Sequence, residues 1–187
     1  MLGSLSFILF FTEDLNDWRL NLRPLRICFP AGIVLLAFSV LNIIAESRAG
    51  LSFGRNGYVP EPRQVLFLIL SAGFLFLLIH TLFFALPAKE AYVAQDSGRK
   101  TCTTGAYALC RHPGVLWLGA FMLCLYLADS FSLPGTVLFS AWNVLLVLFE
   151  DRCVFPARLS DYGSYRRRTP FLIPTRASMN DFLFRRK

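Results

Sequence analysis

The apolar positions of this chain fall into long runs that are separated by short polar stretches. Two runs, residues 25–45 and 65–88, are long enough for a helix to cross a hydrocarbon core of about 30 Å. Two shorter runs follow at residues 115–128 and 133–149. The pattern predicts an all-α integral membrane protein with about four transmembrane helices.

The residues between the third and fourth runs predict a turn. Asp129, Ser130, Ser132, Pro134 and Gly135 cluster there, and residues of these types favour turns. Each flanking run is short for a full crossing of the bilayer. The last two helices are therefore expected to form a tight hairpin that thins the bilayer locally.

A further apolar stretch, residues 5–11, is too short to span the membrane. It either lies at the membrane interface or packs on the bundle, and the sequence leaves both open. Glu13 and Asp14 follow it where a signal peptide would have a small-residue cleavage site. We expect a single membrane domain, with a subdivision of the chain into three parts: a helix region 1–64, a core 65–175 and a basic tail 176–187.

The basic residues predict the orientation of the helices. The formal net charge is +7, and only three of the nineteen Lys and Arg residues lie in segment 46–64. If the chain starts inside the cell, all the others lie on the cytoplasmic side, as the positive-inside rule favours. Both termini are thus predicted to be cytoplasmic. Because the basic residues flank apolar runs, they indicate lipid headgroups, and not nucleic acid, as partners.

Composition supports the same class of protein. Hydrophobic residues make up 55% of the chain and charged residues 17%, so the excess apolar surface requires a lipid bilayer. The five cysteines form neither a CxxC pair nor a cluster with zinc spacing, so no metal site is predicted. His80 is a candidate functional group because ionisable residues are rare inside membranes. A neutral histidine hydrogen-bonded within the bundle is the alternative.

Two polar segments bracket the predicted hairpin. Arg111 and His112 stand just before Pro113, and Glu150 and Asp151 follow the last apolar run. Since a hairpin returns the chain to the same depth, we expect the basic pair to lie opposite the acidic pair. Free N–H groups at the helix start, with the basic pair, could bind a carboxylate or phosphate. A structural helix start and a membrane-boundary acidic pair are the alternatives.

Tyr162 and Tyr165 precede three consecutive arginines. One interpretation is an interfacial aromatic belt with snorkelling arginines. The other is an aromatic wall of a cofactor pocket.

The order of these motifs resembles the isoprenylcysteine carboxyl methyltransferase family, to which the phospholipid N-methyltransferases are related. Gly-x-Tyr-x-x-x-Arg-His-Pro at 105–113 precedes the hairpin, Glu-Asp follows it, and Tyr-x-x-Tyr-x-x-x-Thr-Pro-x-x-x-Pro occupies 162–174. The resemblance covers residues 65–175. It implies a membrane-embedded methyltransferase that uses S-adenosylmethionine on a lipophilic or prenylated substrate, with carboxylate O-methylation favoured.

The resemblance also implies roles for individual residues. Arg111 and His112 would hold the carboxylate end of the methionine moiety, and Glu150 would bind another polar part of the cofactor. Arg111 and Glu150 are the implied catalytic residues. The implied cofactor-binding residues are Tyr107, Arg111, His112, Pro113, Glu150, Asp151, Tyr162 and Tyr165. An amine or thiol substrate would also require a proton acceptor, which the sequence does not identify.

The chain departs from the family pattern at a few positions. Val115 replaces an aromatic residue, Leu159 and Ser160 replace a Phe-Gly pair, and Pro156 interrupts the helix expected after the acidic pair. Two alternatives to the methyltransferase follow. One is an NADPH-dependent membrane reductase of the sterol-reductase type, and the other is a non-enzymatic membrane subunit.

Overall fold

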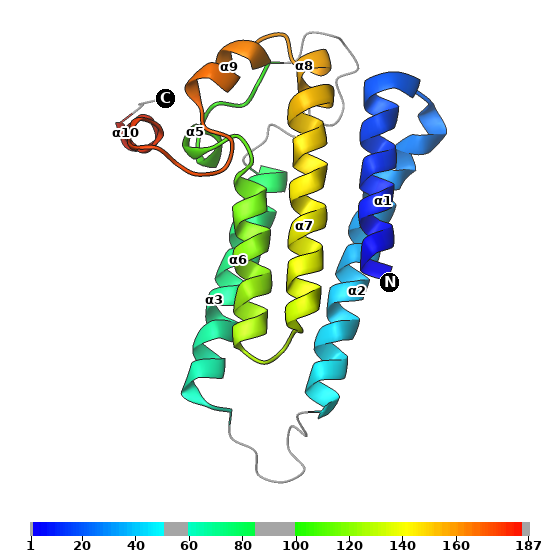
Figure 1. Ribbon diagram of the computed structural model, residues 1–187, viewed down its shortest axis with the longest axis vertical. Coiled ribbons are helices and arrows are strands. Elements are labelled where there is room, and N and C mark those ends of the chain that lie inside the picture. The colour runs from blue at the N-terminus through cyan, green and yellow to red at the C-terminus, as the bar shows by residue number, and fades with distance from the viewer. Residues whose placement is uncertain (1, 51–59, 85–99, 185–187) are drawn as a thin grey trace.

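The computed structural model describes residues 2–50, 60–84 and 100–184. Throughout these residues the protein consists of helices joined by turns and loops, which confirms the all-α prediction. The long helices lie side by side, and several short helices gather at one end of the bundle (Figure 1). We call this the polar end.

Among the described residues, three helical segments are long and apolar enough to cross a membrane: Arg23–Asn42, Pro62–Phe84 and Leu133–Arg158. The third apolar run of the sequence forms a shorter helix, α6 (Pro113–Leu127). The structure therefore supports a membrane protein with three candidate spans. The predicted count of four depends on whether α6 crosses the bilayer with its neighbour.

The first two candidate spans each begin at a proline-containing turn. A short 3-10 helix, η2 (Arg23–Ile27), leads into α2 (Cys28–Gly50). Helix α3 (Pro62–Ile79) begins after Glu61, which forms a capping box with Gln64. The helix continues as a π-helical turn, η3 (His80–Phe84). The predicted end of this span, residues 85–88, lies outside the described residues.

Helices α6 and α7 (Leu133–Phe149) form the predicted hairpin. Asp129 takes the left-handed conformation, with a φ of 55°, and thereby ends the α6 side of the turn. Ser132 then caps α7, since its side chain accepts a hydrogen bond from the backbone N–H of Gly135. The turn residues picked out in the sequence thus close the hairpin.

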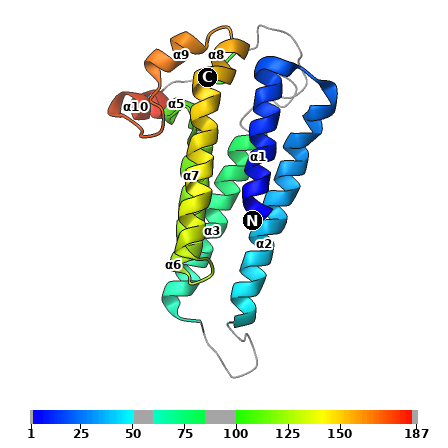
Figure 2. The same cartoon turned by 45° about the vertical axis from the view of Figure 1, so that its right-hand side comes forward.

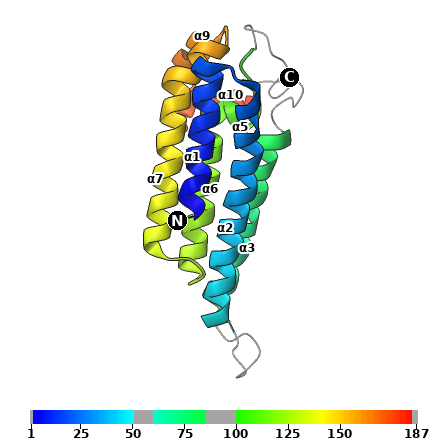
Figure 3. The same cartoon turned by 90° about the vertical axis from the view of Figure 1, so that its right-hand side faces the viewer.

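The N-terminal apolar stretch packs on the bundle, which decides between the two alternatives. It belongs to α1 (Leu2–Leu15), which contacts both α2 and α7 (Figures 2 and 3). Phe7 and Phe10 are buried there in one core with Phe121, Met122 and residues of α7. This helix begins part-way along the bundle and reaches the polar end at its C-terminus (Figure 3).

Large apolar side chains face outward along α2 and α3. Val34, Leu41, Ile69 and Phe76 are each about two-thirds exposed, at 69%, 65%, 66% and 66%. Soluble monomers rarely present continuous apolar surfaces of this kind. This surface is compatible with a lipid bilayer around the helices.

The polar end is built mainly from the segments that precede α6 and follow α7. A π-helical turn, η4 (Glu150–Val154), continues α7 and leads into α8 (Phe155–Arg158) and α9 (Tyr162–Arg168). The predicted basic tail contains α10 (Arg176–Phe184), which packs on α5 (Ala106–Leu109). Pro156 lies in the first turn of α8, where its missing N–H is tolerated.

Candidate functional site

A buried ion pair between Arg111 and Asp151 lies at the centre of the polar end. Arg111 Nε is 2.8 Å from Asp151 Oδ1, and the two side chains are only 8% and 4% exposed. The Arg111 Nε–H is not directed at the carboxylate, so this contact is an ion pair and not a hydrogen bond. Arg111 Nη2 donates a hydrogen bond to Asp151 Oδ2 at 3.3 Å. The hairpin thus brings together the two motifs that the sequence placed at the same depth.

Arg111 also holds the segment that follows α9. Its Nη1 donates to the carbonyl oxygens of Arg166 at 2.8 Å and Thr169 at 3.1 Å. The backbone N–H of Arg111 donates to the carbonyl of Pro170 at 2.9 Å. One guanidinium therefore joins the start of α6, the acidic pair and the C-terminal segment.

His112 lies between the two carboxylates. Its Nε2 is 3.4 Å from Asp151 Oδ1, and its Nδ1 is 3.8 Å from Glu150 Oε2. The ring stacks on Phe155 at 5.8 Å between centroids and meets the edge of Phe171 at 5.1 Å. Burial in this aromatic setting lowers the pKa of His112, although the hydrogen bond with Asp151 acts in the opposite direction. The imidazole is therefore neutral at pH 7.

Tyr162 is a further partner of Asp151, beside Arg166, whose Nε lies 3.7 Å from Asp151 Oδ2. Its hydroxyl donates to Asp151 Oδ1 at 2.5 Å, and the tyrosine is 3% exposed. Burial, followed by the hydrogen bond to the carboxylate, raises the pKa of Tyr162 above its ordinary value. The phenol stays protonated and acts as a fixed donor to Asp151.

Tyr165 and Tyr107 form a second contact between α9 and α5. The Tyr165 hydroxyl donates to the backbone carbonyl of Tyr107 at 2.7 Å. The Tyr107 hydroxyl in turn donates to the carbonyl of Thr81 at 3.4 Å, and the Trp117 Nε1–H donates to the Thr81 hydroxyl at 3.1 Å. The two tyrosines therefore connect the C-terminal segment to η3, the turn that continues α3. The spacing of residues in the sequence did not indicate this connection.

Glu150 is the most exposed carboxylate of the predicted set. Its side chain is 22% exposed, compared with 4% for Asp151. It lies within electrostatic reach of Asp14 at the end of α1. Pro113, by contrast, is fully buried in the first turn of α6, where it serves as a helix start.

A polar cavity of about 210 Å³ is lined by residues of α5, α9, α10 and the adjoining loops. Of the predicted cofactor residues it contains Tyr165. It is lined by Thr103, Ala108, Asp161, Ser164, Tyr165, Arg168, Thr169 and Asp181. Asp161 accepts hydrogen bonds from the backbone N–H and the hydroxyl of Thr101, at 2.8 Å and 2.7 Å, which fixes one wall.

The donor set of this cavity suits the amino-acid end of S-adenosylmethionine. Arg168 can pair with a carboxylate, and Asp161 and Asp181 can accept hydrogen bonds from an ammonium group. The volume is smaller than the roughly 300–1,000 Å³ of pockets that enclose a whole ligand. The cavity is therefore large enough for one end of such a molecule, and the remainder would extend beyond it.

His80, the candidate that the sequence places inside the membrane, lies away from the Arg111–Asp151 ion pair. His80 is exposed at the start of η3. Its ring centroid is 6.1 Å from that of Phe76 and 6.1 Å from that of Phe84. Among the described residues, no three His, Cys, Asp or Glu side chains are grouped so that they could hold a metal ion.

Sequence reasoning missed two residue groups at the polar end. Phe155 and Phe171 enclose His112, and Asp14 approaches Glu150. Asp14 followed an apolar stretch, but its neighbours depend on how α1 packs, so no local pattern marked it.

Comparison with known proteins adds no family. No protein-family model matches the chain, and searches of curated proteins and of solved structures find no significant match.

Proposed function

We propose that this protein is a membrane-embedded methyltransferase that uses S-adenosylmethionine to methylate a lipophilic acceptor. One observation carries the proposal: Arg111 and His112 meet Glu150 and Asp151 at one end of the hairpin. These are the ordered motif residues on which the family resemblance rests, and Tyr162 joins them. The bound cofactor would supply an activated methyl group on a sulfonium centre.

In this proposal the chain binds the cofactor next to α9. Arg168 pairs with the methionine carboxylate, and Asp161 and Asp181 accept hydrogen bonds from its ammonium group. Tyr165 lines the same cavity and contacts Tyr162 with ring centroids 6.0 Å apart. Glu150, the partly exposed carboxylate, binds a further polar part of the cofactor or substrate.

The buried network has a positioning role in this mechanism. Arg111 connects Asp151 to the backbone that carries Thr169, and Thr169 lines the polar cavity. Methyl transfer from a sulfonium depends mainly on orientation and on exclusion of water. A fixed network that closes the cavity wall provides both. Arg111 thus acts through the cavity wall, and this differs from the direct carboxylate contact predicted from sequence.

We place the polar end on the cytoplasmic side. Arg158 donates to the backbone carbonyl of Asp17 at 2.6 Å, so the basic segments after α1 and after α7 lie at the same end. Most of the basic residues are in these segments, and the positive-inside rule favours a cytoplasmic location for them.

A structural role for the network is the competing proposal. The guanidinium of Arg111 is 8% exposed, and it pairs with Asp151 and two backbone carbonyls without any ligand. A non-enzymatic membrane subunit would need such an ion pair only to hold its C-terminal segment in place.

Cofactor binding distinguishes these proposals. Calorimetry on the full chain in a non-ionic detergent would measure the affinity for S-adenosylhomocysteine. We expect binding by the intact protein and a loss of about tenfold in Arg168→Gln, because a charge-assisted hydrogen bond is removed. The matched control is Arg167→Gln, which changes the neighbouring exposed arginine outside the cavity.

Glu150→Gln tests the second contact in the same experiment. This isosteric change keeps the volume of the side chain and removes its charge, so a weaker affinity would assign Glu150 to the ligand. If the folded intact protein does not bind S-adenosylhomocysteine, the methyltransferase proposal is wrong and the structural role is favoured.

A further inference from the structure

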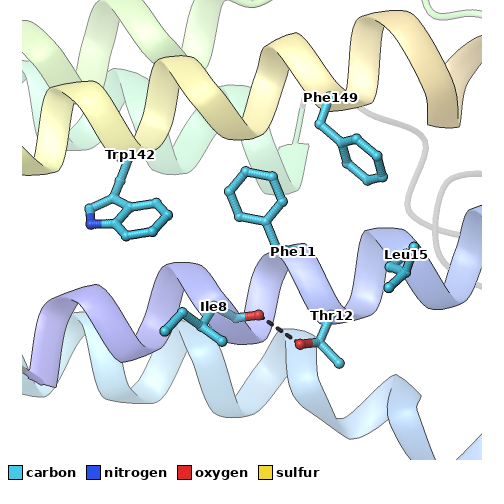
Figure 4. Close-up of a pocket in the computed structure, with 6 residues that line it drawn as sticks. All are labelled: Ile8, Phe11, Thr12, Leu15, Trp142 and Phe149. Atoms are coloured by element: carbon cyan, nitrogen blue, oxygen red, sulfur yellow. Dashed lines mark hydrogen bonds between the residues drawn. The ribbon is translucent and has the colours of Figure 1, made fainter.

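A second, apolar cavity lies between α1 and α7 (Figure 4). It has a volume of about 440 Å³ and forms a groove along the two helices. Phe11 projects from α1 towards α7, while Trp142 and Phe149 project from α7 (Figure 4). The complete lining is Ile8, Phe11, Thr12, Leu15, Trp142 and Phe149. We call this the α1–α7 groove.

The walls of the α1–α7 groove are aromatic and its rim is open. Phe11 meets Trp142 and Phe149 with ring centroids 6.2 Å and 5.8 Å apart. Ile8 and Leu15 on the rim are 49% and 42% exposed. The Thr12 hydroxyl donates to the Ile8 carbonyl of its own helix at 2.8 Å, so no unpaired polar group enters the groove from it. The groove therefore suits a hydrocarbon chain that enters from the bilayer.

One end of the α1–α7 groove is acidic. Asp14 lies between the lining residues Thr12 and Leu15, and Glu150 directly follows Phe149. Asp14 and Glu150 are close enough to interact electrostatically. The end of the groove formed by Leu15 and Phe149 is thus adjacent in the chain to two interacting carboxylates, one in α1 and one in η4.

The cations near this end leave part of the negative charge unpaired. Arg158 pairs with Asp17 at 3.3 Å, and Arg26 interacts with Glu13 at longer range. Glu13 Oε2 and Asp14 Oδ2 are nevertheless buried without a hydrogen-bond partner in the described part of the chain. A buried carboxylate oxygen without a partner is costly, so a cationic group supplied by a ligand would stabilise this arrangement.

We infer that the α1–α7 groove binds the hydrocarbon chain of a lipophilic amine whose ammonium group lies against Asp14 and Glu150. This inference names the class of methyl acceptor. The role of the amine as an acceptor rests on the proposed methyltransferase function. It differs from the carboxylate acceptor favoured by the family resemblance. Binding of the amine is a separate property that can be measured without the cofactor.

The charge of the groove end decides between an amine and a carboxylate. Where Asp14 is ionised, a carboxylate headgroup would be placed beside a like charge in a partly buried setting, which disfavours its binding. An ammonium headgroup would pair with Asp14. Burial and the neighbouring Asp17 and Glu13 carboxylates raise the pKa of Asp14 to about 7. Asp14 can therefore also accept the proton that an ammonium group must release before its nitrogen becomes a nucleophile.

Fluorescence of Trp142 provides a direct test. The full chain in a non-ionic detergent is titrated with ω-bromoundecylamine and, separately, with ω-bromoundecanoate, because bromine on the chain quenches a tryptophan that it contacts. We expect half-maximal quenching by the amine at a concentration about tenfold lower than by the carboxylate. Subtracting the signal of Trp142→Phe removes the contribution of the other tryptophans.

Three variants test the parts of the inference separately. Asp14→Asn should reduce the preference for the amine to about threefold or less, while the carboxylate binds as well or better. Thr12→Phe fills the groove and should weaken quenching by both probes, whereas Leu5→Phe on the same helix lies outside the groove and should not. Equal quenching by both probes in the intact protein, or an amine preference unchanged in Asp14→Asn, would overturn the inference.

The same preparation separates this inference from the proposed function. If S-adenosylhomocysteine binds but the amine has no preference over the carboxylate, the methyltransferase stands and the acceptor class is wrong. If the amine is preferred but S-adenosylhomocysteine does not bind, the groove is a site for lipophilic amines and its role as an acceptor site is overturned.

Discussion

The two ends of the α6–α7 hairpin each carry an Arg–Asp ion pair in very different surroundings. At the polar end, Arg111 and Asp151 are 2.8 Å apart with side chains 8% and 4% exposed. At the opposite end, Arg63 and Asp129 are 2.6 Å apart with side chains 51% and 52% exposed. Both pairs join an arginine to an aspartate, and their N–O distances are nearly the same. The comparison therefore isolates the effect of burial.

Burial changes what such a pair can do. Water screens the exposed pair, and Asp129 keeps a second contact from Gln64 Nε2 at 3.2 Å. Asp151 is buried away from water, and its contacts with Arg111, His112 and Tyr162 offset the cost of desolvating its charge. The buried pair therefore fixes the positions of several segments, whereas the exposed pair makes only a water-screened link between the start of α3 and the turn.

The largest predicted effect follows from removing the buried carboxylate. Asp151→Asn leaves the Arg111 guanidinium without its counter-ion, which we expect to destabilise the protein by about 3–5 kcal/mol. Thermal unfolding in a non-ionic detergent would measure the change. The double variant Arg111→Met, Asp151→Leu removes both charges and should recover much of the stability; if it does not, the contacts of Arg111 with the backbone carbonyls matter more than the ion pair.

A smaller effect is expected from the hydroxyl of Tyr162. Tyr162→Phe removes one hydrogen bond to an ionised acceptor while keeping the ring in place, and should cost about 1.5–3 kcal/mol. The same unfolding measurement applies, with Tyr126→Phe as a control, because Tyr126 lies on α6 away from the Asp151 cluster. A loss no larger than that of the control would show that Asp151 is compensated without Tyr162.

Asp14 sharpens the comparison because it is a partly buried carboxylate that forms no ion pair within the described part of the chain. Its pKa is raised to about 7, above its ordinary value of 3.8, so the folded state retains a proton that the unfolded state releases. Stability is therefore lost as the pH rises from about 4 towards 7, and the ionised group destabilises the protein above that range.

Asp14→Asn should remove this penalty. We expect the variant to be more stable than the intact protein by roughly 1–2 kcal/mol at pH 8, and the difference to shrink at pH 5. Unfolding temperatures of the two proteins at both pH values would measure this. A variant that is less stable at pH 8 would mean that Asp14 has a cationic partner there.

The smallest predicted effect concerns the exposed pair. Asp129→Asn should cost about 0.2–1 kcal/mol, and the difference should decrease further when salt is added. A loss comparable to that of Asp151→Asn would contradict the contrast between the two ends. Since Asp129 also has a left-handed backbone conformation that Asn tolerates well, the substitution tests the charge alone.

Sequence reasoning predicted the pairing of the basic and acidic motifs because a hairpin has few geometries. Two helices joined by a short turn return the chain to one depth, so Arg111 and Asp151 had to lie near each other. The role of α1 was not predictable in the same way. Its apolar stretch was too short to identify as a span, and its packing on α7 depends on close contacts such as that of Gly3 with the Phe139 ring.

The contrast between Glu150 and Asp151 also shows that sequence patterns do not predict which side chain is buried. The two residues are adjacent and chemically similar, but one side chain is 22% exposed and the other 4%. Which carboxylate turns inward depends on the helical phase at η4 and on the space beside His112. The sequence predicted an acidic pair at this site, and only the packed structure assigned the ion pair to Asp151.

By itself the sequence determined that this protein is helical, apolar enough for a bilayer, and folded back between the apolar runs 115–128 and 133–149. These properties depend on local hydrophobicity, helix length and turn residues, which act over short stretches of chain. The tertiary structure decided that α1 and α7 form a groove, that Asp14 and Glu150 from these two regions interact, and that Arg111 forms a buried ion pair with Asp151. Those features join residues far apart in the chain, and side-chain packing alone sets the distances between them.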